Sequence, residues 1–135
     1  MQLRPMPKID ADSAPFWAGT AESELRIQRC RQCQQPRFYP RLLCPKCWSD
    51  DSEWVVTSGL GTIYSYSVVH RSPWRALAEE VPYVVALVDL DDGVRMFTTI
   101  TDSPDLVKID SRVRVSYREV SPDLFLPVFS LMSDA

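Results

Sequence analysis

The sequence predicts a mainly β protein, in which an N-terminal short helix and a small metal-binding ribbon precede a five-stranded barrel. Two observations carry this prediction. Four cysteines form two CxxC pairs with ten residues between the pairs. Beyond Gly59 the chain becomes a series of segments rich in β-branched and aromatic residues, separated by turn signals, as is typical of strands. We expect an arm and helix over 1–28, the ribbon over 29–52 and the barrel over 53–135.

The composition is that of an ordinary globular protein and excludes several classes. The chain has 135 residues, of which 45% are hydrophobic and 24% charged, and its formal net charge is -3. Nucleic-acid-binding proteins usually carry a positive surplus, so this balance argues against them. No segment approaches the ~18 apolar residues that cross a bilayer, and residues 1–15 lack the apolar core of a signal peptide. We therefore expect a cytoplasmic protein with no membrane contact.

The N-terminal region is expected to be an extended arm followed by a helix. Residues 1–14 hold several prolines and acidic residues and few apolar ones. Residues 15–23 can form a short helix, with Pro15 in its first turn and Ser13 as a possible N-cap. The alternating segment 24–29 then leads into the first cysteine pair, with Leu25 and Ile27 on one face.

The four cysteines are predicted to bind one metal ion. Thiols stay reduced in the cytoplasm, so two close pairs indicate a metal site rather than disulfides. Zinc prefers four ligands in a tetrahedron, and two CxxC turns supply that set. Because protein atoms fill every position, the zinc is expected to be structural. Iron uses the same ligands in rubredoxin-like sites, so it stays an alternative. The predicted ligands are Cys30, Cys33, Cys44 and Cys47.

Five barrel strands are predicted, with a helical break over 72–81 after the first and a short connection over 103–108 after the third. Asp92-Gly93 is a typical hairpin turn, and Pro127 belongs at an edge or a bulge. This count and order fit an oligonucleotide/oligosaccharide-binding (OB) fold, with another five-stranded Greek-key barrel as the alternative. The predicted strands are 61–70, 83–90, 94–100, 112–120 and 124–132.

Several motifs together resemble a known family. FWAG precedes the first cysteine pair, FYPRLLCPKC contains the second, and SGLGTIYSYSVVHR and PYVVALVDLDDGVRMFTTITD follow. From Phe16 to Phe129 the chain resembles the domain of unknown function 35 (DUF35) family of rubredoxin-like zinc ribbon plus OB-fold proteins. The family is associated with acyl-CoA chemistry and forms complexes with thiolase-fold enzymes, including acyltransferases and aldolases that cleave steroid side-chain CoA thioesters.

The resemblance implies an accessory subunit that docks on a thiolase-fold protein and helps bind or channel an acyl-CoA thioester. If that partner is dimeric, a heterotetramer is the natural symmetric assembly. We predict no catalytic residue in this chain, because every cysteine is committed to the metal and no GxSxG motif is present. A nucleic-acid-binding ribbon–OB module and a stand-alone acyl-CoA-binding protein stay open as alternatives.

Cationic side chains are candidates for contact with a ligand or a partner. Arg112, Arg114 and Arg118 share one face of a predicted strand. Guanidinium groups can bind the phosphates of CoA or acidic groups of a partner, although such a stripe is often a solvated strand face. Arg37 and Arg41, near the ribbon, raise the same two alternatives. The single histidine, His70, either packs at the surface or contacts substrate or partner.

Aromatic side chains and two glycines supply further candidates. Trp74, after the first barrel strand, is a candidate for an exposed anchor. Phe16 and Trp17 either cover this chain's own barrel or enter a partner. Tyr64 and Tyr66 are expected to share one strand face, where they pack against the core or ribbon or stack on bases. The last set, Gly59 and Gly61, either permits a sharp turn or allows close approach of a ligand such as pantetheine.

Overall fold

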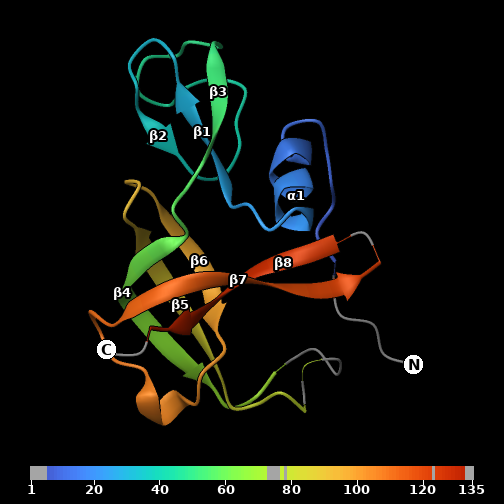
Figure 1. The fold of residues 1–135 in the computed structure, drawn as a ribbon, viewed down its shortest axis with the longest axis vertical. Coiled ribbons are helices and arrows are strands. Elements are labelled where there is room, and N and C mark those ends of the chain that lie inside the picture. Colours follow the sequence, from blue (N-terminus) through green and yellow to red (C-terminus); the bar gives the residue numbers. More distant parts are fainter. Residues whose placement is uncertain (1–5, 73–76, 78, 123, 133–135) are drawn as a thin grey trace.

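The structure is a computed structural model that describes residues 6–72, 77, 79–122 and 124–132. It is mainly β, as predicted: one short helix and a small sheet precede a closed barrel (Figure 1). Within the described residues no helix is both long and apolar enough to cross a membrane. The elements are α1 (Ala14–Ala21), β1 (Arg26–Cys30), β2 (Pro36–Arg37), β3 (Ser52–Val56), β4 (Leu60–Val69), β5 (Tyr83–Leu90), β6 (Arg95–Ile100), the 3-10 turn η2 (Pro104–Leu106), β7 (Arg112–Ser121) and β8 (Leu124–Leu131).

Helix α1 starts as predicted, but its capping differs. Pro15 lies in the first turn, where its missing N–H costs nothing. Ser13 is at the N-cap position, yet its side chain makes no bond to the helix. The backbone of Ser13 is αR rather than extended. Ser13 Oγ accepts a hydrogen bond from the N–H of Asp10, and the N–H of Ser13 donates one to Asp10 Oδ1. The end of the arm is thus fastened by a local turn.

The ribbon sheet has the strand order β2-β1-β3, all antiparallel. Strand β3 pairs along its whole length with β1. The ribbon sheet therefore reaches Val56. Leu25 and Ile27 are buried on one face, as the alternation predicted.

The barrel has the closed order β4-β5-β6-β8-β7, which is that of an OB fold. The three strands β4 to β6 form an antiparallel meander, and β8 returns to lie parallel to β6. Gly93 lies in the β5–β6 hairpin with φ of 98° and donates its N–H to Leu90 O, as the Asp-Gly pair predicted. In the predicted break, the described part shows one turn, with Glu80 N–H donating to Leu77 O.

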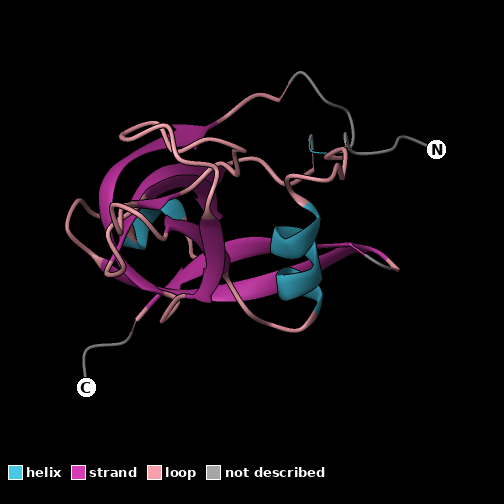
Figure 2. Ribbon diagram, turned by 90° about the horizontal axis from the view of Figure 1, so that it is seen from above, coloured by secondary structure: helices cyan, strands magenta, loops and turns pink. Residues whose placement is uncertain are grey.

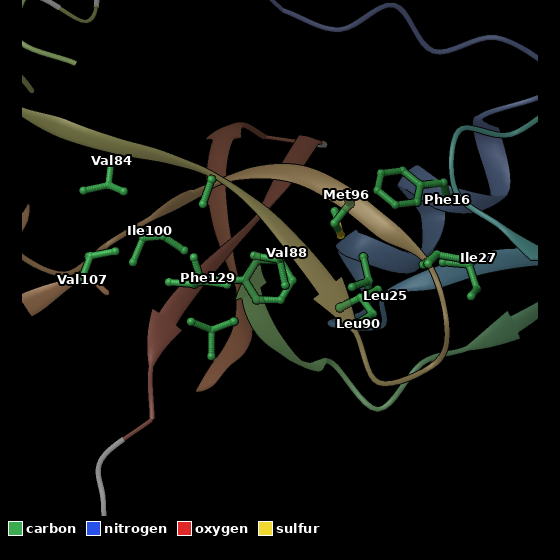
Figure 3. Packing of buried hydrophobic residues seen from close by; sticks show 14 residues of the cluster. Phe16, Leu25, Ile27, Val84, Val88, Leu90, Met96, Ile100, Val107 and Phe129 are labelled. Carbon is green, nitrogen blue, oxygen red and sulfur yellow. The ribbon is translucent and has the colours of Figure 1, made fainter. Parts of the chain in front are cut away.

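One hydrophobic core joins the helix, the ribbon and the barrel. Phe16, Leu25 and Ile27 belong to the same buried cluster as Met96 and Phe129 (Figure 3). The long β7–β8 hairpin extends out of the barrel beneath α1, and α1 packs on β8 (Figures 1 and 2). The ribbon and the barrel therefore share their packing and are not separate cores.

A β-bulge changes which residues of β4 face inward. The register with β5 shifts between Ile63 and Ser65. Ile63 is fully buried, whereas Tyr64 is 52% exposed under the guanidinium of Arg95 and Tyr66 packs against the core. The expectation that Tyr64 and Tyr66 share a face is wrong, because the extra residue of the bulge reverses the alternation.

Gly59 and Gly61 meet steric demands of the fold. Gly59 has φ of 75°, and a Cβ there would lie 2.5 Å from Val115 Cγ1. A Cβ on Gly61 would lie 2.7 Å from the carbonyl oxygen of Asp89. Backbone permissiveness and close strand packing therefore explain both residues.

The barrel closes between β6 and β8, and we call this junction an open seam because a strand ladder joins it at one place alone. Ile100 and Phe129 form the single registered pair of these strands, and Thr101 N–H donates to Phe129 O. The Phe129 carbonyl therefore faces β6, and so does that of Pro127 two residues earlier, which accepts from Thr98 Oγ1 at 3.2 Å. The missing N–H of Pro127 thus faces the seam, which confirms its predicted place at an edge.

Candidate metal centre and apolar groove

The four cysteines converge at the end of the ribbon and fit one metal ion. Their sulfur atoms all lie within 4.8 Å of one another. Cys30 Sγ lies 3.5 Å from Cys47 Sγ, and Cys33 Sγ lies 3.6 Å from Cys44 Sγ. A tetrahedral zinc with bonds of ~2.3 Å would place its sulfur ligands about 3.8 Å apart. The arrangement therefore matches a zinc site in which protein thiolates fill every position.

The two CxxC turns have the same main-chain construction. Gln34 N–H donates to Cys30 O, and Trp48 N–H donates to Cys44 O, each at 2.9 Å. Gln34 and Trp48 both have a left-handed φ, of 64° and 67°. We call each such turn a knuckle. The repeated geometry directs main-chain N–H groups at the sulfurs, for example Lys46 N–H at 3.4 Å from Cys44 Sγ.

These N–H groups favour thiolates, but the cluster needs a cation. Hydrogen bonds from the N–H groups of Cys47 and Lys46 lower the pKa of Cys44 to about 6. The N–H of Cys33 likewise lowers the pKa of Cys30. For Cys47 the N–H of Ser49 acts in the same direction, but burial and the three neighbouring sulfurs outweigh it and raise its pKa to about 12. Four thiolates this close require the two positive charges of a zinc ion.

A buried polar network supports the ribbon beside the metal centre. Arg37 Nε donates to Gln28 Oε1 at 3.0 Å, and both residues are buried. Arg37 Nη2 donates to the carbonyl of Arg41 and to Ser52 Oγ. The Arg37 guanidinium therefore has a structural role in the ribbon and is not available to a ligand or partner. Its Nη1 is buried with no hydrogen-bond partner among the described residues.

The second feature is a groove of about 780 Å³ along the open β6–β8 seam, between α1 and the segment before β5. We call it the apolar groove. Aromatic and aliphatic side chains form most of its wall, namely Phe16, Trp17, Phe38, Tyr39, Tyr83, Met96, Phe97, Leu126, Pro127 and Val128. Phe97 and Tyr39 are 56% and 55% exposed, so the groove opens to solvent.

Polar groups of the groove are tied to the protein itself. Asp102 Oδ1 accepts from Leu131 N–H at 2.7 Å. Arg118 Nη1 forms a 2.7 Å salt bridge with Glu80, and Thr98 donates to Pro127 O. The polar side chains thus fix the shape of the groove.

The structure brings some of the predicted contact residues together and separates others. Phe16 and Trp17 line the groove with their rings 4.9 Å apart, and Phe16 also belongs to the core. Arg118 reaches the groove as well. Trp74 lies outside the described residues, so its role as an anchor stays a prediction.

The remaining candidates lie away from the groove. Arg112 forms a bidentate salt bridge with Asp91, which uses its guanidinium at the surface. Arg114 alternates with the buried Val113 as predicted and is exposed. His70 and Arg41 are exposed too, and neither lines the groove.

Sequence reasoning missed Phe97 and Tyr39 as groove residues. A signal for Phe97 existed, since Met96, Thr98 and Ile100 alternate inward and leave an aromatic residue on the outer face of β6. The groove itself depends on how β6 and β8 meet, and this contact joins distant parts of the chain.

These features define a protein that combines a rubredoxin-like zinc ribbon with an OB-fold barrel. Residues 17–53 match the family model described as "ChsH2, rubredoxin-like zinc ribbon domain", and residues 54–118 match "ChsH2, C-terminal OB-fold domain". The chain belongs to the DUF35 family, as its motifs predicted. The match to a zinc ribbon decides between zinc and iron in favour of structural zinc.

Two of the relatives are named as enzyme subunits. The chain is 40% identical over 115 residues to the 3-oxo-4,17-pregnadiene-20-carboxyl-CoA hydratase alpha subunit of Mycobacterium tuberculosis, which covers 82% of this chain and 35% of that protein. It is 33% identical over 92 residues to the benzoylsuccinyl-CoA thiolase subunit BbsA of Geobacter metallireducens, which covers 68% and 60%. The chain thus spans less than two thirds of each.

A solved structure also matches. It is described as the Ltp2-ChsH2(DUF35) aldolase, with a TM-score of 0.85 and 39% identity, and the match covers 93% of this chain and 98% of that chain. The zinc ribbon and barrel therefore occur in the same arrangement in a chain associated with an aldolase.

Proposed function

We propose that this chain is a cytoplasmic, non-catalytic subunit that docks on a thiolase-fold enzyme and holds the acyl part of a CoA thioester in the apolar groove. The groove is the observation that carries the proposal. The relatives support it, because they include subunits of a thiolase, a hydratase and an aldolase. In this reading the enzyme acts as an aldolase, another lyase or an acyltransferase.

The groove has the size and lining of a site for an apolar acyl group. Its volume of about 780 Å³ lies within the usual range of about 300–1,000 Å³ for small-molecule sites, which are mostly apolar. Phe97 and Tyr39 leave one side exposed. A partner that covered this side would complete the site and remove the acyl group from water. Rigid ring systems suit such aromatic walls, and a steroid side-chain CoA thioester is one such substrate.

We assign the catalytic steps to the thiolase-fold partner. General acid–base or nucleophilic catalysis needs a side chain free to reach the reacting atoms. The charged groups in the described part of the groove, Asp102, Glu80 and Arg118, are engaged in bonds within the chain. The four cysteines converge on the metal. This leaves the present chain the tasks of binding and orientation.

The first experiment measures assembly. A thiolase-type protein from the same organism is co-expressed with this chain, and each peak from size-exclusion chromatography is analysed by light scattering and for zinc. We expect a two-plus-two complex with one zinc per copy of this chain. Separate elution of the two proteins at micromolar concentration would contradict the proposal. Binding of single-stranded oligonucleotides at low salt would instead favour the nucleic-acid-binding alternative.

The second experiment tests the groove in that complex by calorimetric titration with benzoyl-CoA, a steroid-derived acyl-CoA and acetyl-CoA. Phe97→Asp places a charge on the groove wall and is expected to weaken binding of the ring-bearing thioesters at least tenfold. Leu106→Asp is the matched control, because Leu106 is similarly exposed, at 60%, and lies outside the groove. If the two variants weakened binding equally, the groove would not be the binding site of the acyl group. Tight binding of acyl-CoA to this chain alone would favour the stand-alone binding protein.

A further inference from the structure

Trp48 combines a left-handed main-chain conformation with an exposed indole, and only the conformation is explained by the fold of this chain. It has φ of 67° and is 75% exposed. A positive φ is unfavourable for a bulky side chain. An indole that remains in water contributes no hydrophobic stabilisation to the folded state. Gln34 takes the same position in the first knuckle with a polar side chain. The turn is therefore a property of both knuckles, whereas the indole is specific to the second.

Two leucines beside the second knuckle extend the apolar surface around Trp48. Leu42 and Leu43 are 68% and 41% exposed. Cys44 N–H donates to Ser49 O, and Trp48 N–H donates to Cys44 O, both at 2.9 Å, so the segment that enters the knuckle after Leu43 and the segment that leaves it at Trp48 meet at Cys44. We call Leu42, Leu43 and Trp48 the knuckle patch. None of these residues lines the apolar groove.

The charges around the knuckle patch indicate what kind of surface covers it. Three other arginines of the ribbon region are paired with carboxylates: Arg26 with Glu22 and Glu24, Arg29 with Glu53, and Arg31 with Asp51 and Glu53.

Arg41 and Lys46 flank the patch and are exposed, and neither has a salt bridge within the described part of the chain. The side-chain cations of Arg41 and Lys46 at the border of the patch are therefore available to carboxylates of a partner. A complementary surface would be apolar at its centre and acidic at its border.

We propose that the knuckle patch is a second docking surface, which inserts Trp48 into an apolar pocket bordered by carboxylates on the partner enzyme. Two of the four metal ligands, Cys44 and Cys47, belong to the second knuckle, so the main chain at Trp48 is ordered before binding and little backbone entropy is lost on docking. Large aromatic residues of this kind dominate the energetics of interfaces. The inference rests on the proposed function, since it places a second contact on the same partner.

Two matched glycine variants test the role of the indole. Trp48→Gly and Gln34→Gly each replace a side chain at a left-handed position with the residue that best tolerates it. Both variants should keep one zinc per chain. Trp48→Gly should raise the Tm of the isolated chain slightly, and Gln34→Gly should raise it less, because it also loses the 2.8 Å hydrogen bond from Gln34 Nε2 to Arg31 O. Trp48→Gly alone should weaken assembly with the thiolase-type partner at least tenfold, measured by biolayer interferometry.

The double variant Arg41→Glu, Lys46→Glu tests whether these two cations face carboxylates of the partner. It should slow association with the partner at low salt and reduce the salt dependence of the association rate. Lys108→Glu is the control, because Lys108 is an exposed cation on the barrel, far from the knuckle in sequence, and should change neither.

The outcomes separate this inference from the proposed function. A wild-type chain that fails to assemble overturns both. A complex that forms equally well with wild type and Trp48→Gly overturns the knuckle patch alone. A Trp48→Gly chain that loses zinc or melts at a lower temperature would show that the indole stabilises its own ribbon, which also overturns the inference. Weaker assembly by a more stable, zinc-loaded chain supports it.

Discussion

Thr98 on β6 donates a hydrogen bond to the main-chain carbonyl of Pro127 on β8, and this 3.2 Å contact bridges the two strands where their ladder is open. Thr98 is buried, and both residues line the apolar groove. The bond therefore sets the distance between the two strands that form the floor of the groove.

Loss of this bond should be measurable as a loss of stability. Thr98→Val keeps the shape of the side chain but leaves the Pro127 carbonyl without its donor. We expect the free energy of unfolding to fall by about 1 kcal/mol, measured by urea denaturation with zinc present. Thr99→Val, on the neighbouring half-buried residue, should change it by less than about 0.5 kcal/mol. Similar losses in the two variants would contradict this role of Thr98.

Removal of the metal should destabilise the whole chain and not the ribbon alone. Leu25 and Ile27 of the ribbon region share one core with barrel residues, so loosening the ribbon removes packing from the barrel. We expect Cys44→Ser to lose zinc, as measured by mass spectrometry, and to unfold in urea in one transition at a lower midpoint. Gln32→Ser changes an exposed residue between two ligands and should keep zinc. Two separate transitions in the wild type would contradict a shared core.

Two glycines with positive φ should differ in their tolerance of alanine. A Cβ on Gly93 would have Pro36 Cγ at 3.4 Å, whereas a Cβ on Gly59 would lie 2.5 Å from Val115 Cγ1. We expect Gly93→Ala to cost about 1–2 kcal/mol for its left-handed backbone. Gly59→Ala should cost about 1–3 kcal/mol more, because it also overpacks the barrel. Thermal unfolding of both variants checks the order, and an equal cost would show that Val115 moves aside freely.

Tyr117 should make the protein sensitive to alkaline pH. Burial, helped by the nearby charge of Glu24, raises the pKa of Tyr117 to about 12, above its ordinary value of about 10. The folded state then holds the phenolic proton more tightly than the unfolded state does. This contribution to stability is complete below about pH 10 and is lost as the pH rises toward 12.

The variant Tyr117→Phe isolates this effect. Urea midpoints of wild type and variant are compared at pH 8 and pH 11, so that other titrating groups cancel. We expect the wild type to lose more stability than Tyr117→Phe between these values. A phenolate of Tyr117 that appears near pH 10 by ultraviolet absorbance would contradict the raised pKa.

The elements and the metal centre follow from local sequence signals. The five barrel strands lie within two residues of their expected ends, because alternation and turn residues such as Gly93 act over short distances. The ligands Cys30, Cys33, Cys44 and Cys47 were found for the same reason, since a CxxC turn brings two sulfurs together without help from the rest of the fold.

The features that the sequence did not reveal depend on contacts between distant segments. The bulge at Tyr64 is set by pairing with β5, and alternation alone could not place it. Arg37 seemed available to a ligand, but its burial requires Gln28 and Ser52 from other strands of the ribbon. The groove exists because β6 and β8 share a single registered pair.

Pro127 has a consequence for the behaviour of this protein in solution. Where two strands share a single registered pair, main-chain groups lie outside a strand ladder, and such edges can recruit strands from other molecules and start aggregation. A strand arriving at β8 would need an N–H donor at position 127, and proline has none. The seam can therefore remain accessible to a ligand while resisting the addition of strands from other molecules. We expect Pro127→Ala to increase the aggregation of concentrated protein under conditions in which the fold itself is unchanged.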